Sequence, residues 1–159
     1  MRWLVLFFVM AGYWFQMAAA QGARGPDRLH VLLGSYHALP ARGQFPYDET
    51  NPGLILTWDD PWRGLDASVG VFQNSFSRPS ALVSVSKDWP VGDEHTLGAV
   101  LALATYREED AIFQPLGHGL VLIPSLQRRW TNFFIQGTPL PDPDNIGVVF
   151  AYGLTFDLN

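Results

Sequence analysis

The sequence predicts an all-β protein: an eight-stranded antiparallel transmembrane β-barrel preceded by a cleavable signal peptide. Three observations predict this fold class. The first 20 residues have the pattern of an export signal, eight strand-like segments follow, and cysteine is absent. An exported chain without disulfides can be stabilised by closing its sheet inside a lipid phase, which leaves no strand edge exposed.

The segment of residues 1–20 has the features of a secretory signal. Arg2 is followed by an apolar run, and Met17-Ala18-Ala19-Ala20 offers a small-residue cleavage site. The alternative is a permanent membrane helix, which needs about 20 apolar residues and usually a basic flank behind it. The cleavage pattern favours the signal, so we expect a single barrel domain over residues 21–159.

The composition favours a barrel that faces lipid. Aromatic residues make up 14% of the chain and charged residues only 16%, which suits a hydrocarbon-facing surface with aromatic belts. The net charge of -5 becomes one unit more negative when Arg2 leaves, which argues against nucleic acid as a partner. A soluble lipocalin-like barrel in the periplasm is the alternative, because eight strands also enclose a cup for one small ligand.

Eight strand-like segments recur after residue 21, separated by clusters of Pro, Gly, Asn and Asp. Several are about 9 to 11 residues long, which is the length that a tilted strand needs to cross a membrane. No apolar stripe of helical period persists, so helices are not the scaffold. The predicted strands are Leu29–His37, Gly53–Asp59, Ala67–Ser75, Ser80–Lys87, Thr96–Thr105, Leu120–Gln127, Thr131–Gly137 and Ile146–Phe156.

The connections predict the orientation of the barrel. If the chain starts in the periplasm, the connections after odd-numbered strands lie outside, and three of these four are long, as in outer-membrane barrels. The predicted strands contain too few charges to line a wet channel, so we expect a narrow, partly apolar interior that holds an acyl chain or is packed. The outer connections are 38–52, 76–79, 106–119 and 138–145, and the inner ones are 60–66, 88–95 and 128–130.

Few residues carry recognisable chemistry, and we expect no metal or cofactor. The sequence lacks a nucleophile elbow, a phosphate-binding glycine loop and zinc-ligand spacing, and His30, His37, His95 and His118 are too scattered for a metal set. Two acidic stretches lie in outer loops. Asp142-Pro143-Asp144-Asn145 lacks the remaining ligands of a calcium loop and is better explained as a turn. Glu108-Glu109-Asp110 is solvated loop charge or a site for divalent cations that bridge lipopolysaccharide phosphates.

His37 and Ser75 end the first and third predicted strands, and strands of equal direction end on the same rim of a barrel. A neutral imidazole that takes the proton of a serine hydroxyl makes it a nucleophile, and a third group that holds the ring improves the imidazole. We therefore predict His37 and Ser75 as a candidate catalytic pair. A histidine and a serine at strand ends are also common without any catalytic role.

Motifs around this pair follow the order of a known family. By their shared order and spacing the chain resembles the lipid A palmitoyltransferases of the PagP type over nearly all of its mature length. The resemblance implies an outer-membrane enzyme of a Gram-negative bacterium that moves an acyl chain from a phospholipid to lipid A; we expect a monomer. The motifs are His37, Tyr47-Asp48-Glu49-Thr50-Asn51-Pro52-Gly53, Asn74-Ser75-Phe76, Leu122-Ile123-Pro124 and Ile135-Gln136-Gly137-Thr138.

The resemblance also implies roles for single residues. It makes His37, Ser75 and Asn74 the catalytic residues, although Asn74 stands where the family has an aspartate. Asparagine can hydrogen-bond but carries no charge, so Asp48 or Glu49 from the first loop is an alternative source of the carboxylate.

The resemblance also implies a lateral route for lipid through the barrel wall, which prolines in the family help to open. Proline lacks the backbone donor of a ladder bond, so it weakens strand pairing and lets a lipid tail enter sideways. Pro52 and Pro124 are the candidates for such a lateral gate, whereas Gln136 replaces a proline of the family. Ordinary punctuation at strand ends is the alternative for both prolines.

The leading interpretation is therefore an acyltransferase in which Ser75, assisted by His37, transfers or hydrolyses an acyl chain held in the lumen. The alternative is a non-enzymatic outer-membrane barrel of the same fold with a structural or binding role, since a fold does not determine a function.

Overall fold

The computed structural model describes residues 25–38, 47–93, 95–106, 119–141 and 146–158. These ranges contain no helix, and therefore no helix that is long and apolar enough to span a membrane. The expected signal peptide lies outside the described residues. The same is true of His118 and of the two acidic stretches at residues 108–110 and 142–145.

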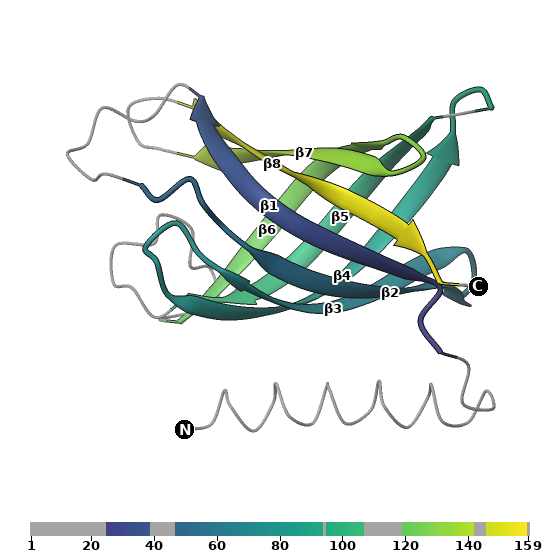
Figure 1. Ribbon diagram of the computed structural model, residues 1–159, viewed down its shortest axis with the longest axis horizontal. Helices are drawn as coiled ribbons and strands as arrows, with labels where there is room; N and C mark the ends of the chain where they lie inside the picture. The colour runs from purple at the N-terminus through teal and green to yellow at the C-terminus, as the bar shows by residue number, and fades with distance from the viewer. Residues whose placement is uncertain (1–24, 39–46, 94, 107–118, 142–145, 159) are drawn as a thin grey trace.

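Eight strands form a closed antiparallel barrel (Figure 1). Each strand pairs with its neighbours in sequence, and β1 (Arg28–Ala38) also pairs with β8 (Ile146–Asp157), which closes the cylinder. The prediction of an all-β, eight-stranded antiparallel barrel is therefore confirmed. The remaining strands are β2 (Gly53–Trp62), β3 (Leu65–Gln73), β4 (Pro79–Pro90), β5 (Thr96–Thr105), β6 (Leu120–Arg129), β7 (Phe133–Pro141) and β8 as given above.

Most strands extend beyond their predicted ends. Only Arg63 and Gly64 connect β2 to β3, and their φ angles are 51° and 77°. Two successive positive φ angles give a tight hairpin turn whose twist matches that of the flanking strands. The connection predicted over residues 60–66 is therefore only two residues long.

The third strand ends earlier than predicted. β3 ends at Gln73, so Ser75 lies in the turn between β3 and β4 and not on the strand. Asn74 explains the early end, because its Oδ1 accepts hydrogen bonds from the backbone amides of Phe76 and Arg78, both at 3.0 Å. An asparagine side chain that bonds to following backbone amides favours a turn over a strand ladder.

A β-bulge in β1 decides which of its residues face the lumen. Before the bulge, the buried positions His30 and Leu32 alternate with more exposed ones. The register with β8 shifts between Leu32 and Gly34. One extra residue reverses the inward and outward alternation of a strand. As a result, Ser35 and His37 face the lumen, whereas an unbroken alternation would point His37 outward.

The outer surface of the barrel carries many large apolar side chains. They come from most of the strands and alternate with the inward positions. Leu126, at 66% exposure, and Val71, at 61%, are the most exposed. Others on this surface are Tyr36, Leu54, Val69, Leu97, Leu101, Phe133, Phe150, Tyr152 and Phe156.

Candidate functional site

His37 and Ser75 meet at one end of the barrel. Ser75 Oγ lies 3.3 Å from His37 Nε2, although the two residues are 38 positions apart in the sequence. This distance is long for a hydrogen bond, and a distance of this size does not exclude a catalytic pair in a protein without substrate. The structure therefore brings together the two residues that the sequence paired, and the imidazole is placed to accept the hydroxyl proton.

Asn74 shapes the turn that carries Ser75. Its side chain is buried, with 1% of the residue exposed, and its Nδ2 donates a hydrogen bond of 3.1 Å to Ser80 Oγ at the start of β4. Its Oδ1 holds the two turn amides described above. These contacts fix the position of Ser75 relative to β4.

One aromatic ring covers the imidazole of His37, and a second ring packs against the first. The Tyr47 ring stacks on it with a centroid distance of 4.4 Å and an interplanar angle of 7°, and Phe76 meets Tyr47 edge-on at 5.9 Å. The Nδ1 atom of His37 has no hydrogen-bond partner among the described residues. Glu49 is near enough for its charge to act on the ring, but it forms no hydrogen bond with Nδ1.

The carboxylate of Asp48 binds the β3–β4 turn. It accepts hydrogen bonds from Ser77 Oγ at 2.7 Å, Gln73 Nε2 at 3.0 Å and the Thr50 amide at 2.9 Å. These bonds hold the pKa of Asp48 below its ordinary value, with the Ser77 hydroxyl as the main cause and the Thr50 amide next. Asp48 therefore contributes to the site through the turn, and sequence reasoning considered it only as a possible partner of the histidine.

The pair lies on the wall of an apolar cavity in the lumen. The cavity has a volume of about 420 Å³. His37, Tyr47, Ser75 and Phe76 line one part of it, and aliphatic and aromatic side chains line most of the rest. The deeper lining includes Leu32, Ile55, Leu82, Ala102, Val121, Ile123 and Phe134.

Two seams of the barrel are incompletely paired on the side of this cavity. β1 pairs with β2 only over Arg28–Leu32 and Gly53–Thr57, and β6 pairs with β7 only over Leu126–Arg129 and Phe134–Gly137. Pro52 lies at the point where the first ladder ends. The sequence-predicted gate residues therefore lie at or beside the two incomplete seams.

The cavity extends into the seam between β6 and β7. Pro124 and Pro139 lie on the two strands just beyond the end of their ladder, and both line the cavity. Where the backbone ladder ends, side-chain hydrogen bonds join the two strands. Ser125 Oγ lies 2.8 Å from Thr138 Oγ1, and Gln136 Nε2 donates to Ser125 Oγ at 2.9 Å. We call Ser125, Gln136 and Thr138 the seam clasp.

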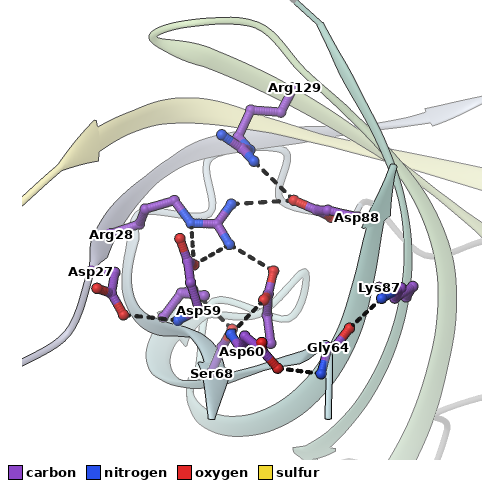
Figure 2. Close-up of polar contacts among 11 residues, drawn as sticks. Asp27, Arg28, Asp59, Asp60, Gly64, Ser68, Lys87, Asp88 and Arg129 are labelled. Carbon is purple, nitrogen blue, oxygen red and sulfur yellow. Dashed lines mark hydrogen bonds and ion pairs between the residues drawn. The ribbon is translucent and has the colours of Figure 1, made fainter. Parts of the chain in front are cut away.

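A charged cluster fills the opposite end of the lumen (Figure 2). The Arg28 side chain, 6% exposed, forms ion pairs with Asp59, Asp66 and Asp88 from three successive strands. Asp88 also pairs with Arg129 at 2.9 Å, so the contacts cross the lumen from β1 to β4 and on to β6. Sequence reasoning missed this cluster, and the signal was present as Arg and Asp residues at the strand ends on this side.

No group of three or more metal-ligating side chains is found in the described part of the chain. A scan against protein-family models found no match for this sequence, and neither did a search of curated proteins. Any functional conclusion therefore depends on the geometry of the site and on the residues that build it.

Proposed function

We propose that this protein is an outer-membrane acyltransferase that moves a fatty acyl chain from a phospholipid to lipid A. Ser75 and His37 are its catalytic pair. The observation that carries the proposal is the 3.3 Å approach of Ser75 Oγ to His37 Nε2 on the wall of an apolar cavity. A nucleophile and its base beside an apolar cavity suit a substrate with a reactive ester and a long hydrocarbon tail.

The proposed reaction has two half-steps. In the first, Ser75 Oγ attacks the ester carbonyl, His37 Nε2 takes the hydroxyl proton, and the donor leaves as an alcohol that receives this proton. In the second, a hydroxyl of the acceptor attacks the acyl-serine and returns a proton to the serine through His37. Water in place of the acceptor would make the same site a hydrolase.

The cavity and the seams suit the substrate. A volume of about 420 Å³ lies in the range of about 300 to 1,000 Å³ that ligand pockets occupy. Each methylene group buried there contributes about 0.8 kcal/mol to binding. The cavity reaches the seam between β6 and β7, where Pro124 and Pro139 lie, so an acyl chain can enter from the side without crossing the barrel mouth.

The outer surface supports the membrane location. Leu54, Val71, Leu101, Leu126 and Phe150 are exposed on it, and apolar side chains spread over so many strands need a cover of hydrocarbon. Closure of the barrel pairs the backbone groups along most of its strands, as such an environment requires. We propose that residues 1–20 direct export and are cleaved, and that the mature monomer inserts into the outer membrane of a Gram-negative bacterium.

A second candidate function is the non-enzymatic binding of an acyl lipid. It is favoured by His37 Nδ1, which has no hydrogen-bond partner among the described residues. A triad would hold that atom with a carboxylate. In this case the cavity would bind the same lipid without turnover.

The test is the lipid A of cells that express the protein. Lipid A is extracted from cells with wild type, Ser75→Ala or His37→Ala, and its mass is measured. We expect an added acyl chain with wild type and a loss of at least 100-fold in either variant. Free fatty acid in place of acylated lipid A would indicate hydrolysis.

Matched controls separate chemistry from folding. Ser84→Ala changes a serine further down β4, and His95→Ala changes a histidine at the opposite end of the barrel. Both should keep full activity. The binding function would be favoured by two results together. Wild-type protein would leave the mass of lipid A unchanged, and the purified barrel would bind fatty acid.

A further inference from the structure

Asp48 lies between the two segments that form the candidate site. On one side, its segment runs along β1, where the Ser35 amide donates to the Glu49 carbonyl at 2.9 Å. On the other side, the Asp48 amide donates to the carbonyl of Ser75 at 2.9 Å. Asp48 thus touches the backbone of the proposed nucleophile directly. It does so at the seam where β1 and β2 have stopped pairing.

The Asp48 carboxylate holds the turn on both sides of Ser75. One oxygen accepts from Gln73 Nε2 at 3.0 Å and from Ser77 Oγ at 2.7 Å, which are the residues two positions before and two positions after the serine. Ser77 has a φ of 58°, which is costly for a residue other than glycine and needs support from its surroundings. The carboxylate accepts a hydrogen bond from the side chain of that residue.

The residue before Asp48 carries the ring that covers His37. Tyr47 stacks on the imidazole at 4.4 Å and contacts Phe76 at 5.9 Å. A shift of Asp48 therefore moves both the ring that packs against the base and the turn that carries the nucleophile. The hydrogen bonds from Ser77 and Thr50 lower the pKa of Asp48, so its carboxylate is ionised at neutral pH and can accept from all three donors.

We infer that Asp48 is a positioning residue, whose carboxylate clamps the first-loop segment to the β3–β4 turn and thereby sets the approach of Ser75 to His37. The catalytic consequence of this inference rests on the proposed acyl transfer. The geometric consequence does not. A misplacement of about 1 Å in a catalytic pair can reduce the rate by about 100-fold.

The geometric consequence can be measured on the folded protein without any substrate. The ring resonances of His37 are followed by NMR in detergent micelles, and Tyr47→Leu gives their position when the stacking ring is absent. We expect Asp48→Ala to move them toward the Tyr47→Leu position and Asp48→Asn to move them part of the way, because asparagine keeps one acceptor oxygen. Asp48→Glu should return them toward wild type. Asp93→Ala, which removes an exposed carboxylate at the other end of the barrel, should leave them unchanged.

The catalytic consequence is read from the kinetics of acyl transfer. In Asp48→Asn we expect kcat to fall by about 10-fold to 100-fold with little change in KM, because the cavity that binds the acyl chain is intact. His37 resonances that stay at their wild-type positions in both Asp48→Ala and Asp48→Asn would overturn the inference. If wild type has no activity, the proposed function fails, and the NMR result still decides the role of Asp48.

Discussion

The half of the lumen next to His37 contains an apolar cavity of about 420 Å³, whereas the half next to Arg28 is filled by charged side chains. Two backbone hydrogen-bond ladders end before they reach the cavity half, because β1 no longer pairs with β2 there and β6 no longer pairs with β7. In the charged half both ladders are formed. At the boundary between the halves, the rings of Phe134 and His30 meet edge-on, with their centroids 5.3 Å apart.

The comparison shows how a small barrel can combine an apolar cavity with two incompletely paired seams. Unpaired strand segments and unfilled volume both reduce stability. Here these costs are confined to one end, while ladders and ion pairs from five strands hold the other end. We expect substitutions in the charged half to reduce the stability of the whole barrel, and substitutions in the cavity half to affect the site more than the fold.

Removing the charge of Arg28 from the charged half should have the largest effect on the stability of the barrel. Arg28→Met keeps the apolar stem of the side chain but removes the Arg28 cation from Asp59 and Asp66, and it leaves Asp88 paired with Arg129. Loss of one partner of a buried ion pair costs about 3 to 5 kcal/mol. Because the Asp59 side chain is 45% exposed and its share is screened by solvent, we expect about 3 kcal/mol, measured by denaturant unfolding in micelles.

A matched control for this change is Arg63→Asn. Arg63 is an exposed arginine in the β2–β3 turn, and asparagine tolerates its positive φ of 51°. The control should alter the free energy of unfolding by less than about 0.5 kcal/mol. Equal effects of the two substitutions would contradict the role given to the charged half.

The charged half also shows where sequence reasoning stops. Alternation and turn residues are local signals, so all eight strands were predictable from the sequence. However, the predicted strands began at Leu29 and ended at Lys87, one residue short of Arg28 and Asp88. Those charges were assigned to loops, and the expectation of few charges in the lumen holds for the cavity half only. Their contacts form only after β1, β4 and β6 have closed into a barrel.

The site was predictable in its residues but not in its geometry. His37 and Ser75 could be paired, because strand directions place both at one rim. The bulge at Gly34, which turns His37 inward, depends on a close approach of the chain to Glu49 and Tyr152. The role of Asp48 depends on the turn around Ser75. Neither long-range contact leaves a periodic signal in the sequence.

Adding a side chain at Gly34, in the bulge of β1, should have the next largest effect on stability. In Gly34→Ala the added Cβ would meet the Glu49 carbonyl oxygen and the Tyr152 hydroxyl, each at 2.7 Å. Such overpacking typically costs about 1 to 3 kcal/mol. Because the strain falls on the segment that carries His37, we expect acylation of lipid A to decrease by more than the loss of folded protein.

Gly137→Ala is the control for the bulge. A Cβ there would lie 3.4 Å from the Phe150 ring, which is an ordinary contact. It should leave both the melting temperature and the acylated fraction of lipid A close to wild type. A Gly34→Ala protein with wild-type activity would show that the bulge does not position His37.

Opening the seam clasp should have a smaller effect on stability. Ser125→Ala leaves Gln136 Nε2 and Thr138 Oγ1 without the hydroxyl between them, and a lost hydrogen bond of this kind costs about 1 to 2 kcal/mol. We expect the seam to widen and a fluorescent fatty acid to enter the cavity faster, as measured by stopped flow. Thr131→Ala, an exposed change in the same hairpin, should not alter the rate, and a slower entry in Ser125→Ala would argue against this route.

The smallest effect is expected when acid protonates the carboxylate of Asp48. We call the hydrogen bonds that this carboxylate accepts from Gln73, Ser77 and Thr50 the Asp48 clamp. The hydrogen bonds from Ser77 and Thr50 lower the pKa of Asp48 from its ordinary value of 3.8, so the clamp is complete above that value and is lost as the pH falls through the lower pKa of the folded protein. The Thr50 amide, which donates to Asp48 Oδ1 at 2.9 Å, should report this titration as an NMR shift below pH 3.8. The shift should disappear in Asp48→Asn. If the Thr50 amide titrates above the ordinary Asp pKa of 3.8, the carboxylate is not stabilised as an acceptor. The two segments would then be held together by backbone contacts alone.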